Sequence, residues 1–132
     1  GVWIGTRFIA TREARALPGF REGILAARED GTTISKAFSG KTMRVIKNET
    51  TARYEADPTL LRPFPEQLMN SFRDGTFHLG GDASTPGVDP AREGYPAGQA
   101  VGAITSIESA GDVVAKMMAE ANAVVNRLNS KS

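Results

Sequence analysis

The chain has 132 residues, of which 40% are apolar and 23% are charged, and its formal net charge at pH 7 is +1. This length allows one domain with a real core, and the balanced charge excludes a strong electrostatic attraction to nucleic acid or to an anionic membrane. The sequence contains no cysteine, which excludes disulfides, thiolate metal ligands and cysteine nucleophiles. We expect a cytoplasmic protein with no membrane span and no secretory signal, although a lack of cysteine is also compatible with export.

The first ten residues, GVWIGTRFIA, predict a buried strand followed by a turn. Residues 2–4 (VWI) form an apolar run without polar alternation, which is typical of a strand buried on both faces. Gly5 and Thr6 follow directly, and a strand, a glycine turn and a helix in this order can place backbone N–H groups around a phosphate. A plain strand-to-helix turn is the alternative. Because a buried strand needs neighbours on both sides, we expect the chain to open inside a larger fold.

Residues 11–29 are predicted to be helical, with Thr11 as the cap and Pro18-Gly19 dividing the stretch into two helices. A turn is expected at Asp30-Gly31.

Two strands are predicted next, at 32–38 and 42–46, and Ser39-Gly40-Lys41 joins them as a hairpin or as two neighbouring strands. Residues 48–56 are expected to form one or two helical turns that end at Asp57-Pro58.

A further helix is predicted to begin at Pro65, with an apolar face formed by Leu68, Met69 and Phe72. The stretch from 75 to 96 is rich in Gly, Pro, Asp and Ser and predicts a long loop, which is uncommon in a compact domain unless it is functional or disordered. A long amphipathic helix is expected from Glu108 to Leu128. We expect Met117 and Met118 to be core residues of this helix.

The segment YPAGQAVGAI, from Tyr95 to Ile104, combines small residues with hydrogen-bonding side chains. Its glycines and alanines allow close backbone approach at a helix start, and Tyr95 and Gln99 can donate or accept hydrogen bonds. Tight packing of a helix N-terminus against another element explains the small residues equally well. Taken alone, the segment does not distinguish a ligand site from a packing site.

Three motifs together resemble the C-terminal part of the nitronate monooxygenase family, formerly called 2-nitropropane dioxygenases. They are VWIGTRFIAT at 2–11, KAFSGKTMRVIKN at 36–48 and YPAGQAVGAI at 95–104, and the resemblance covers essentially the whole chain. It implies an FMN-dependent (β/α)8 TIM barrel related to the flavin-containing enoyl-acyl-carrier-protein reductases. The expected fold is therefore α/β, a C-terminal fragment of such a barrel with an inserted small α/β subdomain.

The resemblance divides the chain into three parts. Residues 1–17 would hold the last barrel strand and the phosphate turn, 18–94 the inserted subdomain, and 95–132 the return to the barrel with the terminal helix. Gly5 and Thr6 match the turn that binds the terminal phosphate of FMN through backbone amides and the Thr6 hydroxyl.

The same resemblance assigns the second segment to the cofactor and the substrate. It implies that Gly98 and Gln99 lie near FMN and that Tyr95 lines the substrate cavity. The family's catalytic histidine follows two glycines on an earlier barrel strand. His78, the only histidine in the sequence, is instead followed by Leu79 and two glycines. We therefore predict no catalytic residue in this chain and interpret His78 as a loop histidine near the subdomain surface.

Several charged residues allow functional interpretations that the sequence does not favour. Arg7 could bind the phosphate, but packing under the following helix or pairing with a carboxylate is favoured. The basic residues of the strand pair could attract a dinucleotide phosphate or an acidic carrier, but a solvated strand face is favoured; they are Lys36, Lys41, Arg44 and Lys47. Asp82 and Asp89 do not have the spacing of a calcium loop, and no metal site is predicted.

We therefore predict part of an FMN-dependent oxidoreductase, with oxidation of alkyl nitronates by oxygen as the favoured activity. NAD(P)H:quinone reduction and enoyl-thioester reduction are alternatives of the same fold. Because the catalytic histidine and most flavin contacts belong to other strands, we expect the chain alone to be inactive. The expected partners are a nitronate or quinone and NAD(P)H as a candidate reductant. The apolar terminal helix and the strand without neighbours also allow a non-catalytic association module that forms a homo-oligomer.

Overall fold

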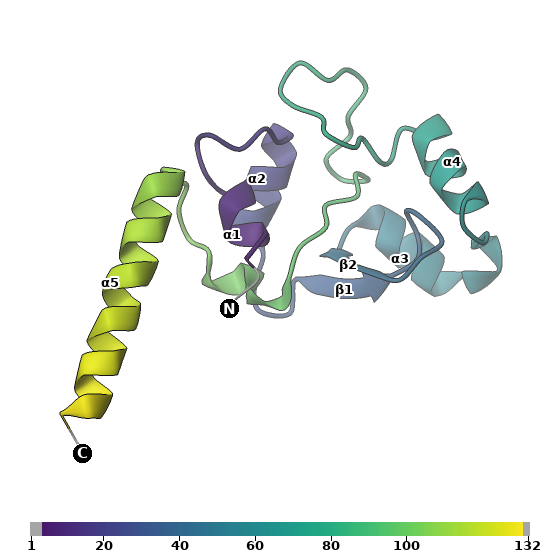
Figure 1. The fold of residues 1–132 in the computed structure, drawn as a ribbon. Coiled ribbons are helices and arrows are strands. Elements are labelled where there is room, and N and C mark those ends of the chain that lie inside the picture. The colour runs from purple at the N-terminus through teal and green to yellow at the C-terminus, as the bar shows by residue number, and fades with distance from the viewer. Residues whose placement is uncertain (1–3, 131–132) are drawn as a thin grey trace.

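A computed structural model describes residues 4–130 of the chain (Figure 1). Its elements, in chain order, are α1 (Thr6–Ile9), α2 (Pro18–Ala26), β1 (Thr32–Ser35), β2 (Met43–Ile46), α3 (Glu49–Ala56), the 3₁₀ helix η1 (Pro58–Leu60), α4 (Glu66–Arg73), the 3₁₀ helix η2 (Gln99–Ala103) and α5 (Ala110–Asn129). The short α1 and α2 lie in the middle of the molecule, with the strand pair, α3 and α4 on one side and α5 extending away on the other (Figure 1). Residues 2 and 3 of the predicted opening strand lie outside the described residues.

The helix predicted from Thr11 is wrong in its first part. The chain forms α1 directly after Gly5 and leaves helical geometry at 11–17. Thr11 is 2% exposed and pairs with Glu108 in an isolated parallel bridge, while the backbone N–H of Arg12 donates to the Glu108 carbonyl oxygen at 3.0 Å. Thr11 and Arg12 are therefore engaged in sheet-like pairing with Glu108, and the helix begins only at Pro18. The second predicted helix is confirmed as α2, with Pro18 at its first position.

The predicted hairpin is confirmed, with shorter strands. β1 and β2 are antiparallel, with Thr33 opposite Val45, and residues 36–42 form the connection. Ala37 and Phe38 were predicted to belong to the first strand, but both turn into the core and are 0% exposed. Burial of these two side chains therefore ends β1 at Ser35.

Helix α3 agrees with the predicted helical turns at 48–56. Asn48 caps it, because its side chain accepts a hydrogen bond from the Thr51 backbone N–H at 3.0 Å and the Thr51 hydroxyl accepts one from the Asn48 N–H at 2.9 Å. This reciprocal pair satisfies amide groups that a helix N-terminus otherwise leaves without partners.

Helix α4 begins one residue after Pro65, and its predicted apolar face is only partly buried: Leu68 packs against the core beside the strand pair, and the Phe72 ring stacks on Phe77. Met69 and Phe72 are 54% and 41% exposed, whereas Gln67 is 1% exposed. The Gln67 side-chain amide donates to the Ala37 carbonyl oxygen at 2.6 Å and to the Tyr54 hydroxyl at 3.0 Å, and its oxygen accepts from the Arg62 N–H at 3.0 Å. The hydrogen bonds of Gln67 and the packing of Leu68 together hold α4 against the core.

The interior is divided into two apolar clusters. The first, cluster A, joins α2 and η2 and contains Ala10, Ile24, Ala97, Val101 and Ile104. The second, cluster B, lies beside the strand pair and contains Ala37, Phe38, Val45 and Phe77. The predicted loop at 75–96 contains no helix and connects the two clusters.

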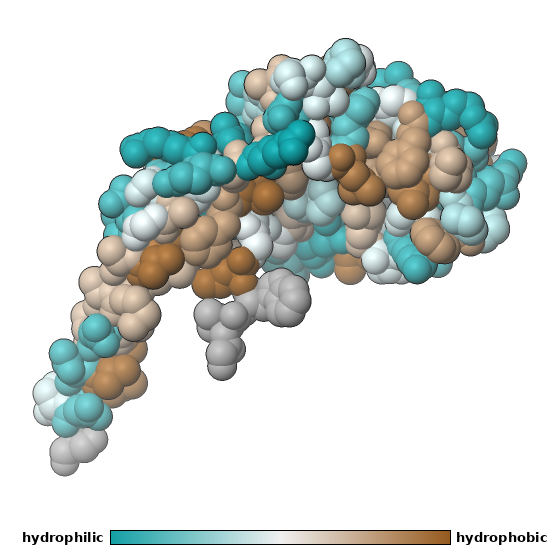
Figure 2. All heavy atoms as spheres, turned by 45° about the horizontal axis from the view of Figure 1, so that its top comes forward, coloured by the Kyte–Doolittle hydropathy of each residue, from teal (hydrophilic) through white to brown (hydrophobic). Residues whose placement is uncertain are grey.

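Helix α5 is confirmed close to its predicted bounds, but most of its apolar face is exposed. Val113 is buried at 3%, whereas Met118 is 57% exposed, so the prediction that Met118 is a core residue is wrong; Met117 is half-buried. The other large apolar side chains of α5 that are exposed are Val114, Val124, Val125 and Leu128. Figure 2 shows α5 extending from the body, with apolar surface along its length.

In the described part of the chain, no helix has both the length and the apolar character needed to cross a membrane.

Candidate functional site

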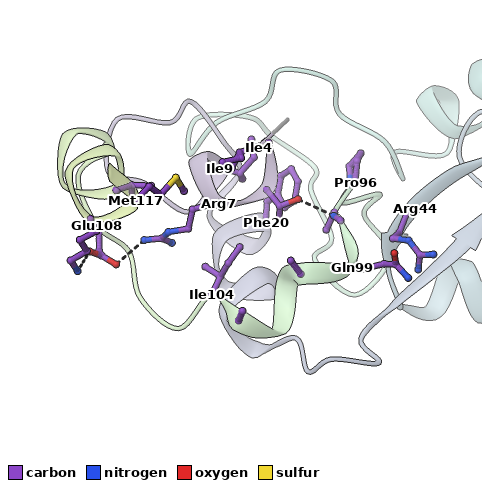
Figure 3. A pocket seen from close by; sticks show the side chains of 18 of the residues that line it. Ile4, Arg7, Ile9, Phe20, Arg44, Pro96, Gln99, Ile104, Glu108 and Met117 are labelled. Atoms are coloured by element: carbon purple, nitrogen blue, oxygen red, sulfur yellow. Dashed lines mark hydrogen bonds and ion pairs between the residues drawn. The ribbon is translucent and has the colours of Figure 1, made fainter. Parts of the chain in front are cut away.

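A pocket of about 1090 Å³ lies between α1, η2 and the first turns of α5 (Figure 3). Four residues that the sequence predicted to bind FMN line it together, namely Gly5, Thr6, Gly98 and Gln99. Apolar side chains form much of the remaining wall, including Ile9, Phe20 and Ile104. The pocket thus combines an apolar wall with a few polar groups, as ligand sites of this size usually do.

A hydrogen bond joins the two predicted motifs across the pocket wall. The backbone N–H of Gly98 donates to the Thr6 hydroxyl oxygen at 2.9 Å, although the two residues are 92 positions apart. Gly5 is the N-cap of α1, so the first backbone amides of this helix lie at the same wall. The Thr6 hydroxyl accepts from Gly98 and can still donate its own proton to a ligand.

Gly5 and Gly98 leave open space beside these donors, and no atom of the described chain fills that space. Gly5 has φ −109°, which any residue adopts, and a Cβ there would meet no atom within 4 Å. A Cβ at Gly98 would lie 3.6 Å from the Thr6 hydroxyl oxygen, an ordinary contact. A Cβ at Gly102, in contrast, would lie 2.7 Å from the Glu29 backbone nitrogen, so Gly102 is required by packing. The space at Gly5 and Gly98 fits a phosphate that approaches the backbone closely.

Arg7 follows the turn but is held by a carboxylate, as predicted. Its Nη2 lies 2.9 Å from Glu108 Oε1, and its Nη1 donates to the Ser106 carbonyl oxygen at 2.8 Å. Glu108 also binds Lys116 and the Ser106 hydroxyl. The hydrogen bonds from Lys116 and Ser106, together with the nearby charges of Lys116 and Arg7, lower the pKa of the Glu108 carboxyl below 4.5. The positive charge of Arg7 is therefore directed toward Glu108.

Comparison with known proteins decides the family. The family model for nitronate monooxygenase matches residues 1–120 of this chain. The chain belongs to the nitronate monooxygenase family. This confirms the predicted resemblance and places the chain in a family of oxidoreductases.

Among curated relatives, a probable nitronate monooxygenase of Staphylococcus aureus (strain Newman) is 36% identical over 84 residues, which are 61% of this chain and 23% of the relative. The corresponding protein of strain JH9 is 34% identical over 84 residues, again 61% of this chain and 23% of the relative. The chain therefore matches about a quarter of the length of these nitronate monooxygenase relatives.

Among solved structures, FabK from Thermotoga maritima, a TIM-barrel enzyme, is similar with a TM-score of 0.72 at 23% identity. That similarity covers 97% of this chain and 39% of FabK. The M276A mutant of the same protein gives a TM-score of 0.67. The likeness supports the predicted α/β class and shows that this nitronate monooxygenase family member shares the fold of part of a TIM-barrel enzyme.

Tyr95 does not line the large pocket of this nitronate monooxygenase family member. Its side chain is 3% exposed and its ring stacks on Phe20, with centroids 4.9 Å apart and planes 14° apart. Within residues 4–130, its hydroxyl has no hydrogen-bond partner. Burial, followed by the charges of Glu93, Glu22 and Asp89, raises the pKa of Tyr95 to about 12. A role of Tyr95 in substrate binding stays a prediction.

His78 is half-buried and paired, which differs from the surface position that the sequence predicted. Its Nδ1 lies 2.7 Å from Glu93 Oε2, and its backbone N–H donates to Glu93 Oε1 at 2.6 Å. Glu93 is 0% exposed, and its backbone carbonyl oxygen accepts from the Asn48 side chain at 2.6 Å. Sequence reasoning missed this buried carboxylate, because a single acidic residue in a polar loop gives no signal of burial.

The basic residues of the strand pair separate into two kinds. Lys36, Lys41 and Lys47 are exposed, as predicted for a solvated face, and the Lys41 ammonium lies 4.0 Å from the centre of the Phe64 ring. Arg44 is half-buried and lines the large pocket beside the segment that contains Gln99. For Arg44, the prediction of a solvated residue is therefore wrong.

Proposed function

We propose that these residues act within an FMN-dependent oxidoreductase and that they bind the phosphate end of FMN. The observation that carries the proposal is the hydrogen bond from Gly98 to Thr6, because it brings two separate motifs to one wall of a large pocket. Bound FMN supplies the redox chemistry, since the flavin accepts electrons from one reactant and passes them to another. Membership of the nitronate monooxygenase family supports this assignment.

The chain's own groups would hold and orient the phosphate. The first amides of α1 point out of the helix N-terminus, and the Thr6 hydroxyl proton is available as a further donor. The missing side chains of Gly5 and Gly98 let the phosphate reach the backbone. Gln99, which lines the same pocket, offers an amide as an additional polar contact.

We infer that the architecture follows the three-part division. Residues 1–17 would supply the last barrel strand and the phosphate turn, 18–94 an inserted α/β subdomain, and 95–132 the return to the barrel. The similarity to 39% of FabK and the match to 23% of a curated relative support a role as one part of such an enzyme. In this proposal, the remaining strands supply the catalytic histidine and the flavin-ring contacts, so the 132 residues alone are inactive.

The substrate we favour is an alkyl nitronate, oxidised with oxygen as the second reactant. The name of the family and of the curated Staphylococcus aureus relatives supports this choice. Quinone or enoyl-thioester reduction with NAD(P)H would use the same phosphate site. Parallel assays of the complete enzyme with a nitronate and oxygen, a quinone and NAD(P)H, and an enoyl thioester and NAD(P)H distinguish the three activities.

The binding proposal is tested with FMN and riboflavin, which differ by the phosphate. In the complete enzyme that carries these residues, Thr6→Val should raise the Kd for FMN about tenfold or more, since it removes a hydrogen bond to a charged group, and leave the Kd for riboflavin unchanged. Thr105→Val, at an exposed position outside the pocket lining, is the control. If wild-type protein binds FMN and riboflavin equally well, the phosphate is not bound here and the proposal is wrong.

One observation favours a second candidate, a non-catalytic association module. Val114, Val124 and Val125 on α5 are 50%, 44% and 53% exposed, and an apolar helix face of this length favours contact with another protein surface. Sedimentation velocity of the 132-residue chain at several concentrations tests this candidate. A stable oligomer that binds no flavin would support association over catalysis.

A further inference from the structure

The cationic side chains that line the pocket differ in their hydrogen-bond and ion-pair partners. Arg7 and Lys116 both bind the carboxylate of Glu108. The Nη1 of Arg44 donates to the Thr32 hydroxyl oxygen at 3.2 Å, and among the described residues Arg44 forms no ion pair with a carboxylate. Since a guanidinium carries five N–H donors, most of its donors are available to a ligand.

The backbone of β2 holds Arg44 close to the pocket wall that contains Thr6 and Gly98. The Ala97 N–H donates to the Arg44 carbonyl oxygen at 3.1 Å, and Val45 pairs with Pro96 in an antiparallel bridge. Gly98, which binds Thr6, follows Ala97, so its Cα is only about 3.8 Å farther along the chain. Ala97 therefore contacts the strand pair through Arg44, and the next residue, Gly98, contacts the turn at Gly5 and Thr6.

Figure 3 shows how the polar groups are distributed in the pocket. The side chains of Arg44 and Gln99 lie at the same end, and the Arg7–Glu108 pair lies at the other end, near Met117. Both Arg44 and Gln99 line the pocket. A cation and an amide donor thus border the pocket at the end nearest β2.

The negative charge of a phosphate requires a positive partner in the pocket. A phosphate monoester carries roughly 1.5 to 2 negative charges at pH 7. The donors of Gly5, Thr6 and Gly98 are neutral, the four residues of α1 form only about one turn, and Arg7 and Lys116 are both engaged with Glu108. A dianion bound among the neutral donors would gain a positive partner from Arg44, which no carboxylate of the described residues engages, through a charge-assisted pair.

We propose that Arg44, with Gln99 beside it, binds the phosphate group of a nucleotide cofactor at this end of the pocket. The inference rests on the proposed function and adds the residue that supplies positive charge. The phosphate has two possible sources, the terminal phosphate of FMN and a phosphate of NAD(P)H. The class of ligand is the same in both cases.

The test uses Arg44→Gln in the complete enzyme, with the Kd for FMN, the Kd for riboflavin and the KM for NADPH as readouts. Lys47→Gln is the matched control, because Lys47 follows the same strand, is exposed and does not line the pocket. Thr32→Val removes the acceptor of the Arg44 hydrogen bond while keeping the charge, so it isolates a purely structural effect. Arg44→Lys keeps the charge and tests the bidentate geometry.

If FMN is the source, Arg44→Gln raises its Kd at least about tenfold, equivalent to about 1.4 kcal/mol, and leaves riboflavin binding unchanged. If NADPH is the source, only its KM rises by a similar factor. In either case the Thr32→Val and Lys47→Gln variants keep a Kd for FMN and a KM for NADPH close to the wild-type values. Added salt weakens binding of the phosphate-bearing ligand more in the wild-type enzyme than in Arg44→Gln.

The inference is overturned if Arg44→Gln changes neither quantity, or if Thr32→Val reproduces its full effect. These results leave the proposed function intact as long as Thr6→Val still weakens FMN binding selectively. Equal binding of FMN and riboflavin by the wild-type enzyme overturns the proposed function itself. The FMN and riboflavin affinities of the wild-type enzyme thus test the phosphate site, and those of Arg44→Gln test the role of Arg44.

Discussion

The guanidinium of Arg7 and the carboxylate of Glu108 lie 2.9 Å apart and connect residues separated by 101 positions. Their side chains are 16% and 21% exposed, so water screens the pair only in part. Together with the Thr11–Glu108 bridge, this pair attaches the start of α5 to the turn that begins with Gly5. Glu108 therefore determines where the terminal helix leaves the body.

Glu108→Gln should lower the thermal midpoint at pH 7, and the loss should depend on pH. The pKa of Glu108 is lowered in the folded state, so its ionic stabilisation is fully present above 4.5 and is lost as the pH falls through the lowered value. The difference in midpoint between wild type and variant should therefore shrink in acid. Glu66→Gln, at an exposed pair with an N–O distance of 3.8 Å, is the control and should have little effect. A pH-independent difference would contradict the prediction.

Gly19→Ala should destabilise the fold, and Tyr95→Phe should restore part of the loss. A Cβ at Gly19 would lie 2.5 Å from the Tyr95 hydroxyl oxygen and 3.1 Å from Pro90 Cβ. Overpacking of this kind costs about 1–3 kcal/mol, and removing the hydroxyl oxygen removes the shorter contact. A double-mutant cycle from urea unfolding measures the coupling, and additive effects would show that the two residues do not contact each other. Gly23→Ala, where the nearest atom would be 3.3 Å away, is the milder comparison.

Tyr95→Phe alone should leave the free energy of unfolding at pH 7 unchanged or raise it. It should also remove the loss of stability that the wild-type protein shows at alkaline pH. The hydroxyl is buried without a partner in the described part of the chain, and such a group costs about 1–3 kcal/mol. The pKa of Tyr95 is raised from 10.0 to about 12, so its neutral form contributes stability that is present below pH 10 and is lost as the pH rises toward 12. Unfolding free energies of the two proteins between pH 8 and roughly 12 check this, and parallel curves would contradict it.

Gln67→Leu should destabilise the protein by about 1–3 kcal/mol, although leucine is the more apolar side chain. The substitution leaves the Arg62 N–H and the Tyr54 hydroxyl without the partner they have now. Met69→Gln on the exposed side of the same helix is the control and should change stability by less than about 0.5 kcal/mol. Equal effects of the two substitutions in urea unfolding would show that the hydrogen bonds of Gln67 do not matter.

If the chain acts as the proposed association module, Val114→Lys with Met118→Lys should reduce its self-association without loss of helix content. Both positions are exposed, at 50% and 57%, so a lysine there should not disturb the fold. Ala115→Lys, exposed at a different angle on α5, is the control. Sedimentation velocity gives the association state, and circular dichroism gives the helix content. Unchanged association in the double variant would exclude this face as the contact.

Local signals predicted several elements well. The stop signal at Asp57-Pro58 and the helical period from Glu108 to Leu128 predicted α3 and α5, because both signals act within a few positions. The failures come from contacts over long distances in sequence. Thr11 resembles a cap, but its backbone pairs with Glu108, and α4 faces the core through Gln67 because of a carbonyl group thirty residues away.

The site was predicted in part. Gly5, Thr6, Gly98 and Gln99 were singled out through the family resemblance, and they line one pocket, while their role toward FMN stays a prediction. Arg44 was interpreted as solvated because the alternation of a short strand does not show that one of its faces borders a pocket. Glu93 was missed, since nothing local marks a loop carboxylate whose partner is fifteen residues away.

The segment from Gly94 to Ala97 joins the two apolar clusters. A Cβ at Gly94 would lie 2.7 Å from Phe38 and 2.8 Å from Phe77, so this end of the segment is wedged into cluster B, whereas Ala97 belongs to cluster A. Four residues thus connect the two clusters. A side chain at position 94 would have to displace Phe38 or Phe77, at the place where the chain enters the segment that leads to Gly98.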